Sequence, residues 1–128
     1  MIDEIALDTL WRCGYFDAVP EPRIDGFSLP LLANFDPRQI DGKLAWLEHT
    51  FDLPMQEECV NYHLSISALP VGTQLFLNGR DYGEISTPFT ADVTDTVFLE
   101  DNLIAFRVFR SAAGAFGTVK LVAIPCNS

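Results

Sequence analysis

The sequence is poor in basic residues. Only 8 of its 128 residues are Lys or Arg, against 18 Asp or Glu, so the formal net charge is −10. This balance would repel a nucleic-acid backbone and an anionic membrane surface. No apolar run approaches the roughly 20 residues that cross a bilayer, and the acidic start MIDEIALDTLWR lacks the basic region of a signal peptide. We therefore expect a soluble, cytoplasmic protein with no nucleic-acid or membrane partner.

Histidine and cysteine are scarce as well. The three cysteines, Cys13, Cys59 and Cys126, are odd in number and widely spaced, whereas a small disulfide scaffold carries a dense, even set. We therefore expect three reduced thiols, and we interpret His49 as a core histidine with one hydrogen-bond partner. Cys59 and His63 would lie about 13 Å apart along one strand, too far to share an ion. No CxxC, HExxH or EF-hand motif is present, so neither a metal nor a cofactor is predicted.

Motifs that carry catalysis are missing too. The segment Gly26–Pro30 lacks the second glycine of G-x-S-x-G, and Gly114–Gly117 is neither a P-loop nor a dinucleotide fingerprint. Glycoside hydrolysis needs two carboxylates about 5 to 10 Å apart across a cleft. Adjacent acidic residues on a strand, such as Glu57/Glu58 or Glu100/Asp101, point to opposite faces instead. We predict no catalytic residues, no enzyme activity and no hydrolysis of aryl glycosides.

The rest of the composition is that of one globular domain, with 48% apolar and 20% charged residues over 128 positions. Residues 1–43 hold four of the eight prolines, and we interpret them as irregular chain that wraps the core. The regular structure expected there is a short N-terminal helix and one helical turn after Asp36-Pro37. Residues 44–125 are predicted to form strands. The single domain 1–128 is therefore expected to combine an irregular segment with a region of strands.

Apolar and polar residues alternate in the second zone. Tyr62, Leu64 and Ile66 alternate with polar neighbours, which turns one row to the core and the other to water. In the same way Ala45 and Leu47 are expected inside and their neighbours outside. Asn78-Gly79 predicts a tight hairpin because both residues tolerate positive φ. The predicted strands give an all-β, antiparallel two-sheet sandwich, and they cover residues 44–53, 62–68, 74–77, 80–85, 88–93, 103–109 and 118–124.

The strand motifs resemble a known family. LAWLEHTFDLP (44–54), YHLSISALPVGTQLFLNGRDYGE (62–84) and PFTADVTDTVFLEDNLIAFRV (88–108) are similar to consecutive strands of the N-terminal sugar-binding domain of glycoside hydrolase family 2. LDTLWR (7–12) is similar to its opening. The resemblance implies a jelly-roll sandwich of the galactose-binding-domain-like type. It also implies that the catalytic barrel of the family is separate from this chain, so the hydrolase activity does not carry over.

The resemblance implies structural roles for matching residues. Asn78-Gly79 would make the hairpin turn, and Phe89 would fill the core. Asp92 and Thr94 would fix the following loop through side-chain to backbone bonds, and Asn102 would start the last motif strand in the same way.

The leading functional hypothesis is a non-catalytic module that binds carbohydrate or serves as an accessory domain to a glycoside hydrolase. We expect a weak sugar site at Trp46, Arg80 and Tyr82, where aromatic faces stack on sugar rings and the guanidinium donates to hydroxyls. The alternative is a structural or interaction domain that binds a protein partner or itself. The apolar segment 27–35 (FSLPLLANF) favours a homodimer.

Overall fold

The computed structural model describes residues 3–18, 20–21, 23–55 and 58–126. Ten strands and two short 3-10 helices (η1 and η2) occur in this part of the chain. Their bounds are β1 Asp3–Ala6, β2 Thr9–Phe16, β3 Phe27–Leu31, η1 Leu32–Asn34, η2 Pro37–Gln39, β4 Leu44–Phe51, β5 Val60–Ile66, β6 Gln74–Leu77, β7 Arg80–Glu84, β8 Phe89–Asp92, β9 Asn102–Phe109 and β10 Val119–Pro125. The described residues contain no helix that is long and apolar enough to span a membrane.

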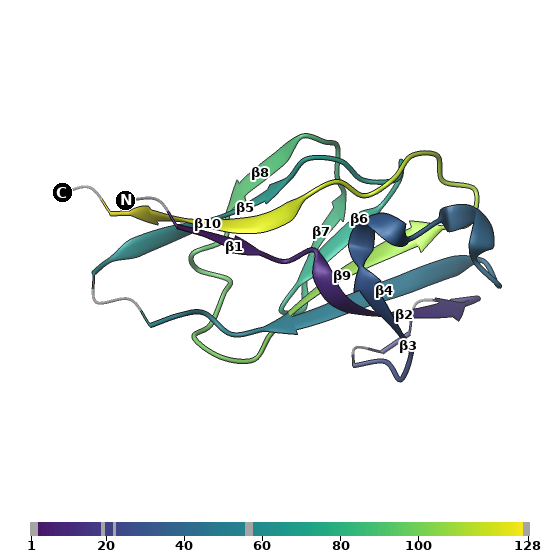
Figure 1. Ribbon diagram of the computed structural model, residues 1–128, viewed down its shortest axis with the longest axis horizontal. Coiled ribbons are helices and arrows are strands. Elements are labelled where there is room, and N and C mark those ends of the chain that lie inside the picture. Colours follow the sequence, from purple (N-terminus) through teal and green to yellow (C-terminus); the bar gives the residue numbers. More distant parts are fainter. Residues whose placement is uncertain (1–2, 19, 22, 56–57, 127–128) are drawn as a thin grey trace.

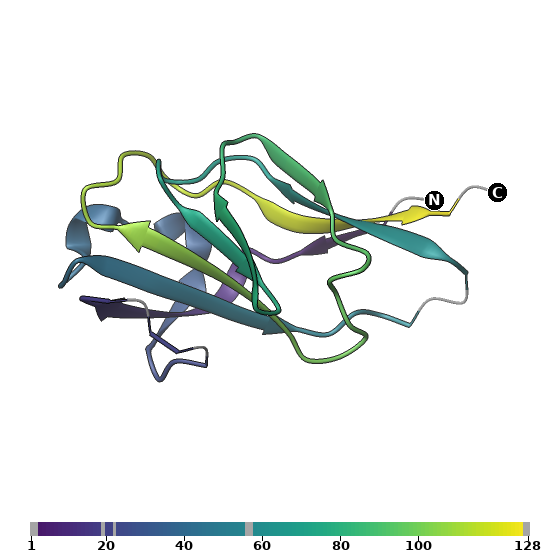
Figure 2. The same cartoon turned by 180° about the vertical axis from the view of Figure 1, so that it is seen from behind.

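The strands form two antiparallel sheets that pack face to face (Figure 1 and, from behind, Figure 2). The four-stranded sheet has the order β1-β10-β5-β8, and the six-stranded sheet has the order β3-β2-β4-β9-β6-β7. Every described pair of neighbouring strands is antiparallel. The predicted two-sheet sandwich is therefore confirmed.

The core lies between the sheets and follows the period of two. Leu47 of β4 pairs in register with Phe106 of β9, which pairs with Leu75 of β6. Leu64 of β5 pairs with Leu121 of β10 in the opposite sheet. All five side chains are fully buried, so the alternation that the sequence shows in these strands sets the inner face of each sheet.

Two predictions for residues 1–43 are wrong: that they are mostly irregular, and that they contain a short N-terminal helix. This zone contributes β1 to the four-stranded sheet and both β2 and β3 to the six-stranded sheet. Trp11 and Cys13 are fully buried on β2, whereas Leu10 and Arg12 on the alternate positions are exposed. Pro30 lies within β3, which is an edge strand, and edge strands are where a sheet tolerates proline. The expected helical turn after Asp36-Pro37 is present as η2, with the Asp36 side chain accepting a bond from the Arg38 N–H.

The prediction of three reduced thiols is also wrong. Cys59 and Cys126 form a disulfide, with their Cα atoms 5.4 Å apart, just outside the paired ends of β5 and β10. Cys13 is free and buried, and burial raises its pKa to about 12. Disulfides are typical of oxidising compartments, which does not favour the cytoplasmic location expected from the sequence.

Candidate functional site

The structure separates the three predicted sugar-binding residues. Trp46 lies on β4, whereas Arg80 and Tyr82 lie on β7, with β9 and β6 between them in the sheet. Trp46 is only 3% exposed. Its ring packs against Phe76, with centroids 5.1 Å apart. A sugar ring cannot stack on an indole that is covered in this way, so Trp46 belongs to the packing of the sheet.

Arg80 and Tyr82 do lie together. The guanidinium carbon of Arg80 is 5.1 Å from the centroid of the Tyr82 ring. Both side chains reach the hydroxyl of Thr96, each at 3.4 Å. Arg80 is exposed and Tyr82 is half-buried, so an accessible cation stands beside an aromatic ring at the end of the β6–β7 hairpin.

Two asparagines hold this hairpin in place. Asn78 has a positive φ of 50° at the turn, and its amide donates to the Thr96 carbonyl at 2.8 Å and to the Asn102 side chain at 2.9 Å. Asn102, which is fully buried, accepts from the Phe98 N–H and donates to the carbonyl of the same residue. The roles that the family resemblance implies for Asn78 and Asn102 are therefore confirmed.

The loop after β8 is fixed as the resemblance implies. The Asp92 carboxylate accepts bonds from the Thr94 N–H at 3.0 Å and from the Thr94 hydroxyl at 2.6 Å. These bonds hold the pKa of Asp92 below its usual range. The Thr94 hydroxyl oxygen in turn accepts from the Tyr62 N–H at 2.9 Å. Phe89 is partly buried against the core.

Glu48 is a buried carboxylate on the outer face of β4, the face that the alternation in the sequence predicts to be exposed to water. Glu48 is only 4% exposed. Its oxygens accept bonds from the Trp46 indole at 2.9 Å, from the Arg23 N–H at 2.7 Å and from the Ile24 N–H at 2.8 Å. The chain between β2 and β3 therefore covers this face. The bonds from the Arg23 and Ile24 N–H groups to the Glu48 carboxylate anchor this loop to β4.

Neither histidine belongs to a metal site in the described part of the chain. No group of three or more His, Cys, Asp or Glu side chains there is placed to hold a metal ion. Cys59 is committed to the disulfide, and His63 lies 4.0 Å from the Asp92 carboxylate. His49 stacks on Trp11 with centroids 5.4 Å apart, and its Nδ1 lies 3.2 Å from the Leu10 carbonyl.

The packing of His49 predicts a loss of stability in mild acid. Burial lowers the pKa of His49 below the ordinary value of 6.5, so the unfolded chain binds a proton more readily than the folded chain. The contribution of His49 is therefore complete above about pH 6.5 and is lost as the pH falls below it. Urea unfolding measured between about pH 6.5 and 5 should show this decline, before most carboxylates titrate.

Substitution His49→Phe, which preserves the stacking, should flatten the decline. Substitution His63→Gln on the other sheet is the matched control and should leave it in place. An unchanged decline in the His49→Phe protein would show that another group is responsible.

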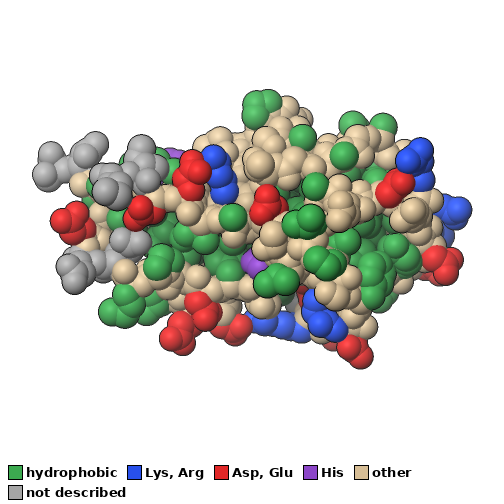
Figure 3. Space-filling view, in the orientation of Figure 1, with side chains coloured by type: hydrophobic (Ala, Val, Ile, Leu, Met, Phe, Trp, Pro, Cys, Tyr) green, Lys and Arg blue, Asp and Glu red, His purple; other side chains and the backbone are tan. Residues whose placement is uncertain are grey.

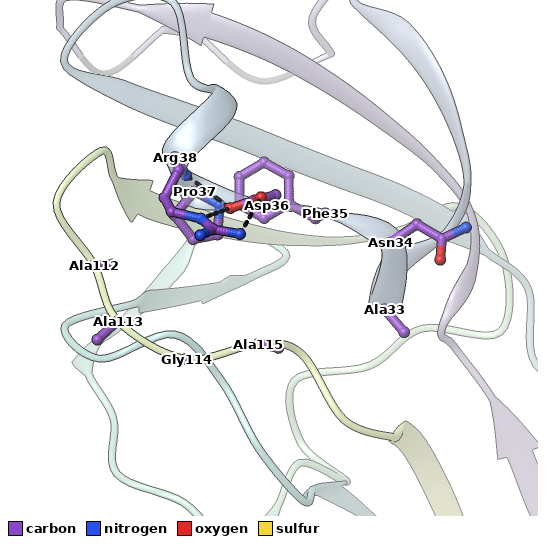
Figure 4. A pocket seen from close by; sticks show the side chains of 10 residues that line it. All are labelled: Ala33, Asn34, Phe35, Asp36, Pro37, Arg38, Ala112, Ala113, Gly114 and Ala115. Carbon is purple, nitrogen blue, oxygen red and sulfur yellow. Dashed lines mark hydrogen bonds and ion pairs between the residues drawn. The ribbon is translucent and has the colours of Figure 1, made fainter.

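Two hollows adjoin at the end of the sandwich where β4 begins and β9 ends. Figure 4 shows the first, of about 500 Å³, between the η1–η2 segment and the loop after β9. Arg38 forms a two-point ion pair with Asp36 there, with nitrogen–oxygen distances of 3.1 and 3.0 Å. These bonds lower the pKa of Asp36, and they fix the guanidinium at the border of the two hollows. The residues around the first hollow are Ala33, Asn34, Phe35, Asp36, Pro37, Arg38, Ala112, Ala113, Gly114 and Ala115.

The second hollow, of about 610 Å³, shares Arg38 with the first. Lys43 and Arg110 line it together with Phe109, whose side chain keeps 39% of its surface exposed. This site could not be predicted from the sequence, because the residues that line it are distant in the chain. The sequence does contain one signal for it. Lys43 stands immediately before the predicted strand 44–53, and Arg110 stands immediately after the predicted strand 103–109.

The fold is that of one part of several larger glycosidases. The beta-glucuronidase of an uncultured Clostridium sp. matches 97% of this chain and 29% of its own, with a TM-score of 0.76 and 17% identity. A Bacteroides uniformis beta-glucuronidase matches 98% of this chain and 18% of its own, with a TM-score of 0.75 and 16% identity. A glycosyl hydrolase family 2 member from Bacteroides cellulosilyticus DSM 14838 matches 94% and 20%, with a TM-score of 0.71 and 20% identity.

The chain thus spans less than a third of the length of these proteins. No protein-family model matches the sequence, and no curated protein matches it either. The solved structures confirm the resemblance to the sandwich domain of glycoside hydrolase family 2 as a likeness of fold.

Proposed function

We propose that the chain is a non-catalytic sandwich module that binds carbohydrate or acts as an accessory domain to a glycoside hydrolase. The observation that carries this proposal is the extent of the likeness. Nearly the whole chain matches, yet it matches at most 29% of the glycosidase. Two places on the surface offer polar groups beside an aromatic ring, namely the Arg80–Tyr82 pair and the hollow around Phe109.

The purified chain should bind oligosaccharides with a Kd between about 0.1 and 1 mM, which corresponds to a weak binding free energy of roughly −4 to −5.5 kcal/mol. Binding should be weak because both places are shallow and bury little of a ligand. A glycan array followed by NMR titration of the ¹⁵N-labelled chain measures the affinity and maps the site. If no glycan binds at millimolar concentration, the carbohydrate-binding proposal fails.

The second candidate is an interaction domain that binds a protein partner or a second copy of itself. Exposed apolar side chains favour it, since Leu10, Phe27 and Leu31 are 73%, 45% and 48% exposed around β2 and the edge strand β3. Pro30 lacks the N–H that strand addition would use at this edge, so a partner would contact side chains. A mass that rises with concentration in light scattering distinguishes self-association from the first candidate.

A further inference from the structure

Basic residues gather at one end of this acidic chain. Lys43 precedes β4 and Arg110 follows β9, and the Arg110 N–H donates to the Lys43 carbonyl at 3.1 Å. Arg38 of η2 lines the same hollow, and Arg107 lies on β9 nearby. These are four of the eight basic residues in the sequence. Blue side chains stand at the right-hand end of the molecule in Figure 3, where β4 begins and β9 ends in Figure 1.

Three of these four basic residues form no ion pair within the described structure. The ion pairs found there include Arg38 with Asp36, but none includes Lys43, Arg107 or Arg110. Because the net charge of the chain is −10, an anion is repelled by the molecule as a whole. Binding at this end therefore depends on direct contact with these side chains.

The hollow combines this charge with an aromatic surface. Phe109 lines it and is 39% exposed, with the Arg107 guanidinium 4.9 Å from the ring centroid. Lys43 and Arg110 line the same hollow as Phe109, and Ser111 adds a polar residue to its lining. Its volume of about 610 Å³ lies within the range of small-molecule sites, about 300 to 1,000 Å³.

We propose that the hollow between Lys43, Phe109 and Arg110 binds a saccharide that carries a carboxylate or sulfate group. The inference rests on the proposed carbohydrate-binding function and names its ligand class. The apolar face of a sugar ring packs on Phe109, and the anionic substituent meets Lys43 and Arg110 through charge-assisted hydrogen bonds. The exposed ring of Phe109 favours a sugar over an acidic peptide. The carboxylates of a peptide would use only the cations, whereas a charged sugar also uses the ring.

Isothermal titration at low salt tests the proposal with three probes. These are an oligogalacturonate, its fully methyl-esterified form, which keeps the sugar rings but loses the charge, and a sulfated galactan oligosaccharide. We expect the first or the third to bind at least about tenfold more tightly than the esterified form. The double variant Lys43→Ala/Arg110→Ala should lose at least about tenfold in affinity, which is about 1.4 kcal/mol. Phe109→Ala should weaken the same probe.

The double variant Arg12→Ala/Lys120→Ala is the matched control, because it removes two positive charges from residues outside the hollow. Equal weakening in this control would show that net charge alone is responsible and would overturn the proposal. Tighter binding of hexaglutamate than of any saccharide would replace the ligand by an acidic peptide. Binding of the esterified form at Tyr82, unaffected by Lys43→Ala/Arg110→Ala, would overturn the anionic site and leave the proposed function standing.

Discussion

Substitution Glu48→Ala is expected to lower the free energy of unfolding by about 2 to 4 kcal/mol. The carboxylate accepts three N–H bonds, one from Trp46, which is buried, and two from the backbone at Arg23 and Ile24. Each buried donor left without an acceptor costs about 1 to 3 kcal/mol, and the two backbone donors lie near enough to the surface to recover part of this cost from water. Urea unfolding followed by tryptophan fluorescence measures the change.

The same substitution should release the loop between β2 and β3. Arg23 adopts a left-handed conformation with a φ of 70°, which is unfavourable for a residue with a Cβ and persists because its N–H is held. Trypsin should therefore cleave after Arg23 faster in the Glu48→Ala protein than in the wild type. Glu84→Ala is the control, since Glu84 is exposed on β7, and it should change stability by less than about 0.5 kcal/mol. A Glu48→Ala protein as stable as this control would show that Glu48 does not anchor the loop.

The sequence predicted the bounds of β6 and β9 closely. The run 74–77 matches β6, and the Asn78-Gly79 turn joins it to β7. The run 103–109 differs from β9 by one residue, Asn102. In these segments alternation and turn chemistry agree with the final packing, so local sequence is sufficient.

The first 43 residues show where local reasoning fails. Pro30 argued against a strand, but the edge position of β3 removes the objection. Trp46 and Glu48 are polar or amphipathic at alternate positions, which indicates a solvent face. That face is covered by Arg23 and Ile24 from a loop more than 20 residues earlier. A period of two shows which residues share a face, but it cannot show whether a distant segment covers that face.

The two candidate sites also differ in how far the local sequence predicts them. Arg80 and Tyr82 lie on one short strand, so their proximity follows from the hairpin. The cationic hollow needs residues near positions 38, 43 and 110 to meet. The contact between Lys43 and Arg110 follows from the pairing of β4 with β9, and that pairing could not be predicted from either strand alone.

Removing the disulfide should lower the free energy of unfolding by about 2 to 4 kcal/mol. Cys59 and Cys126 are 67 residues apart, and a cross-link of this span restricts the unfolded chain by about 4 kcal/mol in the loop-entropy model. The folded state loses little in return, because the β5–β10 ladder and the bond from the Cys126 N–H to the Cys59 carbonyl hold the two ends together. Reduction should lower the Tm by roughly 10 °C.

Thermal unfolding with and without a reductant measures this effect. The double variant Cys59→Ser/Cys126→Ser should match the reduced wild type and should not respond to the reductant. Cys13→Ala is the control that keeps the disulfide, and its response to the reductant should persist. A thiol count in denaturant decides the pairing independently of stability: one reactive thiol, Cys13, is expected in the unreduced protein. Three reactive thiols in protein purified under oxidising conditions would contradict the bond, and the cytoplasmic location expected from the sequence would regain its support.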